Sequence, residues 1–259
     1  MNIFQIVLLS IIEGLTEFLP ISSTAHLIIF SKLLRIQASD FHKLFEVFIQ
    51  GGAILSVIFL YKKLIFEDER LILNVLVAFL PTAFFGFVFY KLIKNVFFEN
   101  IFLISFSLIF IGLIFIFIEY LIFKRQIILN KKIKNLGFKE SFLIGFFQSL
   151  AIIPGVSRAG IVMISMMILG YKRNEAAIFS FLLAVPTIIS ASLFDLYKNK
   201  DLLFLSNNNL FYLFLGSFLS FVFALISIKI FITFLGKKNL VGFGIYRIFL
   251  GIINLFLIK

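Results

Sequence analysis

The sequence predicts an all-α polytopic membrane protein, and its composition and hydropathy pattern are the main reasons. Hydrophobic residues make up 61% of the 259 residues, and the mean hydropathy is +1.12. Soluble domains contain roughly half apolar residues, so a fold in water could not bury this excess. We predict six transmembrane helices plus two re-entrant helical hairpins in an inverted-topology repeat, all within a single integral membrane domain.

Apolar stretches of spanning length account for the six predicted transmembrane helices. A helix that crosses a bilayer needs about 20 predominantly apolar residues. The stretches that meet this requirement are 43–61, 71–93, 101–123, 176–197, 210–235 and 240–258.

Two further apolar regions, 1–36 and 139–170, are interrupted. The first contains Leu19-Pro20-Ile21-Ser22-Ser23 and the second contains Pro154-Gly155-Val156-Ser157. Proline removes a backbone donor, and the pieces on either side are too short to cross alone. Each region therefore predicts two half-helices joined at membrane depth in a hairpin.

The two interruptions resemble each other, since Pro20 to Ala25 and Pro154 to Ala159 match in Pro, Ser and Ala at the same spacing. We interpret this match as an internal repeat. Each half then holds one hairpin and three spans, and three crossings is an odd number, so the second half enters from the opposite side. The halves are about 1–123 and 139–259, with a linker at about 124–138.

Basic residues predict the orientation. The chain has 24 Lys+Arg and 13 Asp+Glu, and six of the basic residues lie between Lys124 and Lys139. Cytoplasmic loops are rich in Lys and Arg, so this linker is predicted inside and both termini outside. Loops near 37–42, 94–100 and 198–209 then lie outside. The bases follow the bilayer topology, so we expect no nucleic-acid partner. The absence of cysteine excludes disulfides and thiolate metal sites.

Glu13 and Glu17 are the first candidates for chemistry, because ionisable groups at bilayer depth are costly unless they are compensated. On one helix the two carboxylates project from the same face, roughly 6 Å apart. A divalent cation, Mg²⁺ or Ca²⁺, would compensate them, as would protonation of one glutamate as a general acid. The alternative is a pair of helix-end glutamates in the headgroup region.

Ser22, Ser23, Thr24 and His26 follow the first interruption. One hydroxyl would serve as the N-cap of the new half-helix. Three consecutive hydroxyls exceed that need and can donate to phosphate oxygens or supply a nucleophile. His26 adds an acid or base suited to neutral pH. His42, in the predicted outer loop 37–42, has no such neighbours and is left out of the site.

Ser157 and Arg158 open the second distal half-helix. The planar guanidinium of Arg158 matches a phosphate bidentately, and a salt bridge to Glu13 or Glu17 is the structural alternative. If the hairpins approach from opposite faces, both distal half-helices direct their positive N-termini to the midplane, where an anion would bind.

Glu46 and Gln50, four residues apart, form either a second polar layer that faces the site or a contact between helices. Arg247 is assigned an internal pairing role. Other ionisable residues, Glu119, Asp195 and Lys229, lie toward the ends of predicted spans.

Two motifs carry a family resemblance. Glu13-Gly14-Leu15-Thr16-Glu17-Phe18-Leu19-Pro20-Ile21-Ser22-Ser23-Thr24-Ala25-His26-Leu27 and Pro154-Gly155-Val156-Ser157-Arg158-Ala159-Gly160 resemble the undecaprenyl-diphosphate phosphatase family of the bacitracin-resistance type. The likeness extends over essentially the whole chain, including Phe45 to Gln50, Phe179 to Pro186 and Tyr246-Arg247. Departures from the family pattern are Ala25 for Gly, Val156 for Thr, Ala159 for Ser and Ile178 for a basic residue.

The resemblance implies a hydrolase of the bacterial plasma (inner) membrane that recycles the cell-wall lipid carrier, uses a divalent cation and has a site open to the outer face. By position, Glu13 and Glu17 would be the acidic, cation-binding pair. Ser22, Ser23, Thr24 and His26 would form the catalytic polar cluster, and Ser157 and Arg158 would bind phosphate. The nucleophile stays open between a serine, the histidine and a water.

Two functions follow from these expectations. The first is hydrolysis of undecaprenyl diphosphate, with bacitracin resistance as its consequence. The second is an inverted-repeat transporter or flippase for a polyprenyl phosphate or another anion, because such carriers also use broken helices. The acid, hydroxyl, histidine and arginine set favours chemistry. The expected partners are the lipid substrate and the bilayer, and the sequence leaves a homodimer open.

Overall fold

The computed structural model describes residues 1–37, 39–89, 100–203 and 207–257, and its regular elements there are helices. This confirms the all-α class. The α-helices are α1 (Ile3–Thr16), α2 (Ser23–Leu33), α3 (Asp40–Glu67), α4 (Glu69–Val88), α6 (Ile101–Phe123), α7 (Phe138–Gln148), α8 (Arg158–Ile168), α9 (Arg173–Lys198), α10 (Asn207–Leu235) and α11 (Val241–Leu257). Short 3₁₀ turns lie at Ile133–Asn135, Ser149–Ile152 and Lys200–Leu203.

Within the described ranges, five helices are long and apolar enough to cross a membrane, namely α3, α4, α6, α9 and α10. They match five of the six predicted spans, although residues 90–93 of the second span and most of the predicted loop 94–100 lie outside the described residues. The sixth span corresponds to α11, which has 17 residues. This is short of the about 20 that a perpendicular crossing needs. The count of six spans therefore stays a prediction.

One boundary in the sequence prediction was wrong. His42 lies in the first turn of α3 and not in an outer loop, because the helix starts at Asp40. The Ser39 side chain accepts a hydrogen bond from the His42 N–H at 3.1 Å, and Asp40 adds a negative charge near the positive end of the helix. These polar residues extend the helix beyond the apolar run. At the other end, α3 continues past a non-helical Tyr61 to Glu67.

The two interrupted regions each form a pair of short helices. The longest of these, α1, has 14 residues and is about 21 Å long at 1.5 Å per residue, which is less than the roughly 30 Å hydrocarbon core. The other three, α2, α7 and α8, have 11 residues each. The non-α segment is residues 17–22 in the first region and residues 149–157 in the second. Both predicted interruptions fall at these segments.

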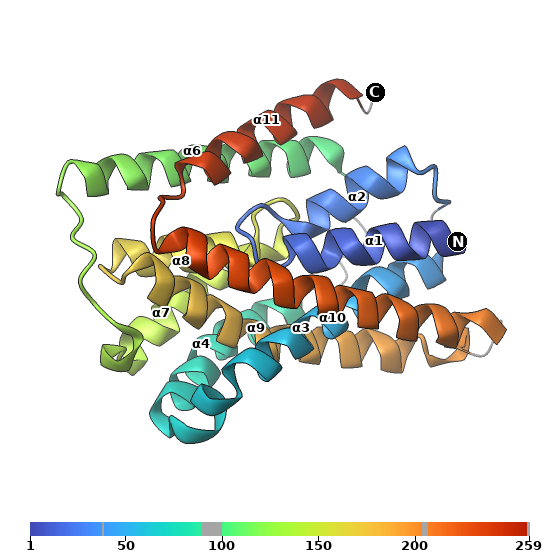
Figure 1. The fold of residues 1–259 in the computed structure, drawn as a ribbon, viewed down its shortest axis with the longest axis horizontal. Helices are drawn as coiled ribbons and strands as arrows, with labels where there is room; N and C mark the ends of the chain where they lie inside the picture. Colours follow the sequence, from blue (N-terminus) through green and yellow to red (C-terminus); the bar gives the residue numbers. More distant parts are fainter. Residues whose placement is uncertain (38, 90–99, 204–206, 258–259) are drawn as a thin grey trace.

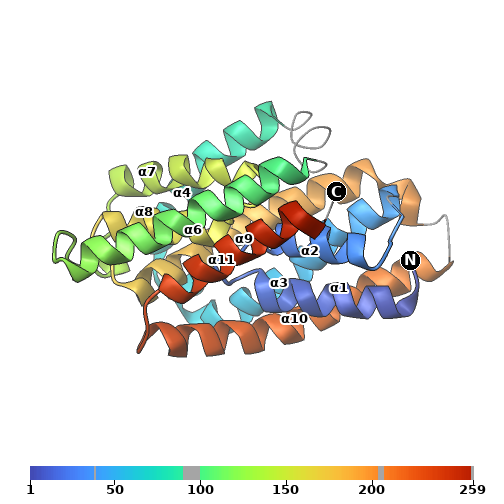
Figure 2. The ribbon, with the colours of Figure 1, turned by 90° about the horizontal axis from the view of Figure 1, so that it is seen from above.

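Helix packing has an internal symmetry. α1 packs along α10, and its counterpart α7 packs along α4, so exchanging the two halves of the chain maps one pair onto the other. Two further pairs, α3 with α9 and α6 with α11, each join equivalent helices of the two halves (Figures 1 and 2). Such packing is what a two-fold internal repeat produces. The opposite orientation of the halves in the bilayer stays a prediction.

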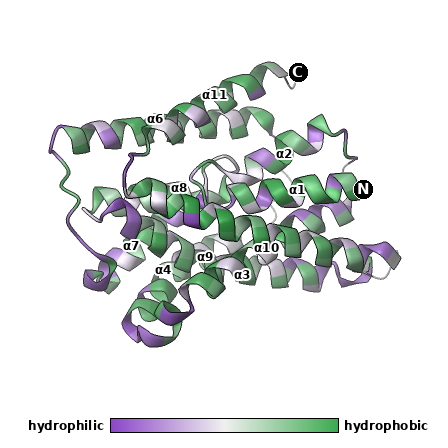
Figure 3. Ribbon diagram, in the orientation of Figure 1, coloured by the Kyte–Doolittle hydropathy of each residue, from purple (hydrophilic) through white to green (hydrophobic). Residues whose placement is uncertain are grey.

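Apolar side chains cover the outside of the helix bundle, as a lipid-facing surface requires. On α6, Phe102, Phe106, Phe110 and Phe117 are all more than half exposed. The polar segments gather at the ends of the bundle, with the 124–137 linker at one end and the end of α9 and the start of α10 at the other (Figure 3). An integral membrane protein accounts for this distribution.

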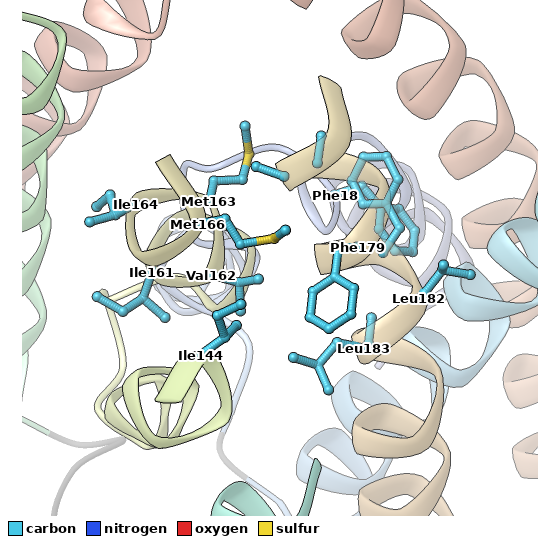
Figure 4. Packing of buried hydrophobic residues seen from close by; sticks show 14 of the residues in the cluster. Phe18, Ile144, Ile161, Val162, Met163, Ile164, Met166, Phe179, Leu182 and Leu183 are labelled. Carbon is cyan, nitrogen blue, oxygen red and sulfur yellow. The ribbon is translucent and has the colours of Figure 1, made fainter. Parts of the chain in front are cut away.

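Among the half-helices, α8 is enclosed most completely. Residues from Ala159 to Met167 are all buried. Met166 points toward Phe179 of α9, and Val162 lies beside Ile144 of α7 (Figure 4). This packing fixes the start of α8, and therefore Arg158, in the protein interior.

Candidate functional site

The two breaks share an unusual backbone geometry. Ser22 caps α2 with φ = 71°, and Ser157 caps α8 with φ = 70°. Each serine oxygen accepts from the N–H three residues on, Ala25 at 3.4 Å and Gly160 at 3.1 Å. Serine rarely adopts positive φ, which costs of order 1–3 kcal/mol. Such strain is typical of functional positions, and here it occurs at equivalent positions of both halves.

A polar cavity of about 190 Å³ lies where the two breaks meet. The first break lines it with Glu17, Ser22, Ser23 and Thr24, and the second lines it with Pro154, Gly155, Ser157 and Arg158. The N-termini of α2 and α8 therefore open onto the same space. The first N–H groups of a helix have no intrahelical partner, so these ends favour an anion.

Glu17 is the centre of a hydrogen-bonded chain in this cavity. Arg158 Nη2 donates to Glu17 Oε1 at 2.8 Å, and Ser23 Oγ donates to Glu17 Oε2. The salt bridge that the sequence analysis held as the alternative for Arg158 is therefore present. Arg158 Nη1 is buried and has no hydrogen-bond partner among the described residues. An oxygen of a bound anion would satisfy this nitrogen.

Glu13 lies one helical turn before Glu17 and is fully buried behind it. It does not line the cavity. Neither carboxylate oxygen has a hydrogen-bond partner in the described part of the chain. A buried carboxylate without partners requires a cation or a proton. Within the described ranges no group of three or more His, Cys, Asp or Glu side chains is found. Two carboxylates still suffice for Mg²⁺ when the substrate's phosphate oxygens complete the shell.

His26 is not among the residues that line the cavity. Its Nδ1 lies 2.7 Å from the Ser22 carbonyl oxygen, and its Nε2 lies 2.7 Å from the Tyr246 hydroxyl. A carbonyl only accepts, so Nδ1 carries the proton and Nε2 accepts from Tyr246. Both nitrogens are engaged. In this structure His26 ties α2 to α11.

Arg247 of α11 joins the two breaks. Its Nη1 donates to the Pro20 carbonyl at 3.0 Å, and its Nη2 donates to the carbonyls of Gly155 at 2.5 Å and Val156 at 3.1 Å. The side chain is fully buried. The predicted pairing role is thus made with backbone oxygens.

The second polar layer divides into two parts. Gln50 lines the cavity. Glu46 instead contacts His42 Nε2 at 3.1 Å and accepts from Ser31 Oγ at 3.1 Å. His42 therefore has polar neighbours, which the sequence analysis did not anticipate, but they lie outside the cavity lining.

Sequence reasoning missed three polar residues that line the cavity, Thr82, Gln148 and Thr187. A signal was present, because each threonine follows a proline within an apolar helix, Pro81 in α4 and Pro186 in α9. The chain has only 4 prolines. The other two, Pro20 and Pro154, mark the breaks, so every proline lies within two residues of a cavity-lining residue.

Comparisons with known proteins identify the family and similar relatives of this chain. Residues 6–253 match the family described as bacitracin resistance protein BacA. A relative from Wolinella succinogenes, an undecaprenyl-diphosphatase, is 46% identical over 256 residues, covering 99% of this chain and 98% of its own. Undecaprenyl-diphosphatases of Persephonella marina, at 45% identity and 98% coverage of both chains, and of Campylobacter hominis, at 40% identity and 100% coverage of both, are also similar.

We predict that Arg247→Met destabilises the protein. The change leaves three buried carbonyls without donors, and each unsatisfied group costs about 1–3 kcal/mol. The midpoint of thermal unfolding in detergent micelles should fall clearly below that of the unaltered protein. Lys229→Met is the matched control, since Lys229 is exposed on α10. Equal unfolding midpoints for the two variants would contradict the bridging role.

Proposed function

This chain belongs to the family of the bacitracin resistance protein BacA, and we propose that it hydrolyses undecaprenyl diphosphate to undecaprenyl phosphate and inorganic phosphate. Relatives that are 40–46% identical over nearly the full length bear the name undecaprenyl-diphosphatase. Such a hydrolase regenerates the lipid carrier of cell-wall synthesis, and bacitracin resistance is consistent with the family name.

The observation that carries this proposal is the chain Ser23–Glu17–Arg158 in the shared cavity. A hydroxyl, a carboxylate and a guanidinium are a nucleophile, a base and a phosphate ligand in direct contact. Phosphoryl transfer depends mainly on positioning and on neutralising charge. Arg158 and the N-termini of α2 and α8 supply positive electrostatic potential for that purpose.

Ser23 is the proposed nucleophile, since His26 has both ring nitrogens engaged outside the cavity. The terminal phosphoryl group displaces Glu17 from Arg158, which leaves the carboxylate free to act as a base. Ser23 Oγ bonds to the terminal phosphorus while its proton passes to Glu17. The bond from phosphorus to the bridging oxygen breaks, and undecaprenyl phosphate leaves. The terminal phosphoryl group remains on Ser23.

Glu13 and Glu17 are the residues that would hold a divalent cation. When bound, Mg²⁺ or Ca²⁺ would neutralise charge on the diphosphate oxygens. The unpartnered oxygens of Glu13 support this assignment. Thr24 and Ser157 line the same cavity and are proposed to contact phosphate oxygens.

The proposed location is the bacterial plasma membrane, with the termini outside and the site open to the outer face. The basic linker between Lys124 and Lys139 supports a cytoplasmic position for that end of the bundle. The termini lie toward the opposite end (Figure 1).

Purified protein in detergent should release phosphate from undecaprenyl diphosphate, and Ser23→Ala should lower the rate by roughly 10³-fold or more, as removal of a nucleophile does. Ser31→Ala is the matched control, because Ser31 lies on the same helix and contacts His42 and Glu46 outside the cavity. It should keep most of the activity. If folded unaltered protein releases no phosphate, the transporter or flippase function takes first place.

Removal of divalent cations with a chelator should suppress phosphate release, and added Mg²⁺ or Ca²⁺ should restore it. Glu13→Gln should raise the cation concentration at half-maximal rate at least about 10-fold. Loss of a residue that hydrogen-bonds a metal ligand already lowers metal affinity by about that factor, and loss of a ligand itself lowers it at least as much. Glu140→Gln, at the start of α7, should leave that concentration unchanged. Full activity after chelation would refute the cation site.

The orientation can be tested by single cysteines, because the chain has none. A membrane-impermeant thiol reagent should label Lys200→Cys in intact cells. It should label Lys132→Cys only after permeabilisation, since Lys132 is exposed in the basic linker. The reverse labelling pattern would show that the assigned orientation is inverted.

A further inference from the structure

One polar cluster of the cavity takes no part in the proposed transfer to Ser23. It consists of Thr82 on α4, Gln148 at the end of α7 and Thr187 on α9, all of which line the cavity. Gln148 is completely buried. A buried amide is costly unless its donors and acceptors are hydrogen-bonded. An amide atom without a partner in the protein therefore indicates the kind of ligand that pairs with it.

The direction of each hydrogen bond in this cluster follows from its partners. Thr187 Oγ1 donates to the Leu183 carbonyl at 2.8 Å, and Thr82 Oγ1 donates to the Gly145 carbonyl at 3.2 Å. Both hydroxyl protons are therefore used. The two oxygens must accept from Gln148 Nε2, at 2.7 Å from Thr82 and 3.4 Å from Thr187. The amide orientation of Gln148 is fixed by these contacts.

Gln148 Oε1 is then left as a buried acceptor without a hydrogen-bond partner in the described part of the chain. A phosphoryl oxygen is also an acceptor and does not satisfy it. A water molecule does, because it donates to Oε1 and keeps its lone pairs free. The cavity of about 190 Å³ is far larger than the roughly 10–15 Å³ that one water needs, so a phosphoryl group and a water fit together.

Gln148 and Ser23 belong to different walls of the cavity. Gln148 forms hydrogen bonds with residues of α4 and α9. Ser23 forms a hydrogen bond with Glu17, which also accepts one from Arg158 of α8. In both ribbon views α4 and α7 lie away from α1 and α2 (Figures 1 and 2). An in-line displacement places the incoming and leaving oxygens on opposite sides of phosphorus. Water that attacks phospho-Ser23 therefore arrives from the side away from Ser23.

We propose that Gln148 positions the water that hydrolyses phospho-Ser23, an inference that rests on the proposed function. The water oxygen bonds to phosphorus, and the bond from phosphorus to Ser23 Oγ breaks. Glu17 returns its proton to Oγ. One water hydrogen stays on the attacking oxygen and the other passes to a phosphoryl oxygen, so dihydrogen phosphate leaves and Glu17 is again a carboxylate. GTPases use a glutamine in the same way to orient water.

The test variant is Gln148→Met, which keeps the size of the side chain and removes the amide. Lipid product and inorganic phosphate are measured separately after rapid mixing with undecaprenyl diphosphate. We expect a burst of one equivalent of undecaprenyl phosphate per protein. Phosphate release should then be about 100-fold slower than in the unaltered protein, which is the loss of rate that a misplaced reactant causes. Mass spectrometry of the quenched protein should find the phosphoryl group on Ser23.

Two further variants keep the test decisive. Thr82→Val conserves shape and removes one acceptor that orients the Gln148 amide, so it should trap a smaller fraction of phospho-Ser23. Gln50→Met alters another glutamine of the same cavity and should trap none.

The outcomes separate the two levels of the proposal. If Gln148→Met slows lipid and phosphate release equally and no phosphoserine accumulates, the water-positioning role is overturned and the hydrolase stands. If Gln50→Met traps the same amount as Gln148→Met, the role is not specific to Gln148 and is also overturned. If unaltered protein releases neither product, both the hydrolase and this inference fail.

Discussion

The buried guanidinium of Arg247 is the contact on which the site depends. Each broken helix leaves backbone carbonyls unpaired at a depth where no bulk water reaches them. One side chain from α11 donates to Pro20 in the first break and to Gly155 and Val156 in the second. It thereby satisfies both irregular segments and fixes their separation. The shared cavity exists because the two breaks are held together.

The packing around the breaks serves the same purpose. α8 is enclosed by α7 and α9, which fixes Arg158 at its start. α11 packs along α6 and carries Tyr246 beside Arg247, so the same helix also holds His26. The strained Ser22 and Ser157 are tolerated because these neighbours leave the backbone no relaxed alternative. Rigid support of this kind suits a reaction in which positioning supplies much of the rate.

In the proposed function, the charged side chains of the cavity bind the diphosphate. Arg158 offers one paired and one unpaired nitrogen, and Glu17 links it to Ser23. In the proposed mechanism, the terminal phosphate of the substrate replaces Glu17 on the Arg158 guanidinium, so binding of the substrate frees the carboxylate that acts as the base. The cluster around Gln148 adds hydrogen-bonding atoms without charge, and in our proposal it binds a water beside the phosphoryl group.

The sequence by itself determined the helical class, both breaks and the residues Glu17, Ser23 and Arg158, since apolar run length, proline and isolated polar residues at bilayer depth are local signals. The predicted start of α3 and the predicted loop position of His42 were wrong, because Ser39 and Asp40 extend the helix beyond its apolar run. Only the tertiary structure decided that Glu13 and His26 stand behind the cavity and that Thr82, Gln148 and Thr187 line it. Those positions depend on how distant helices rotate against one another, and the three-dimensional packing of side chains sets that rotation.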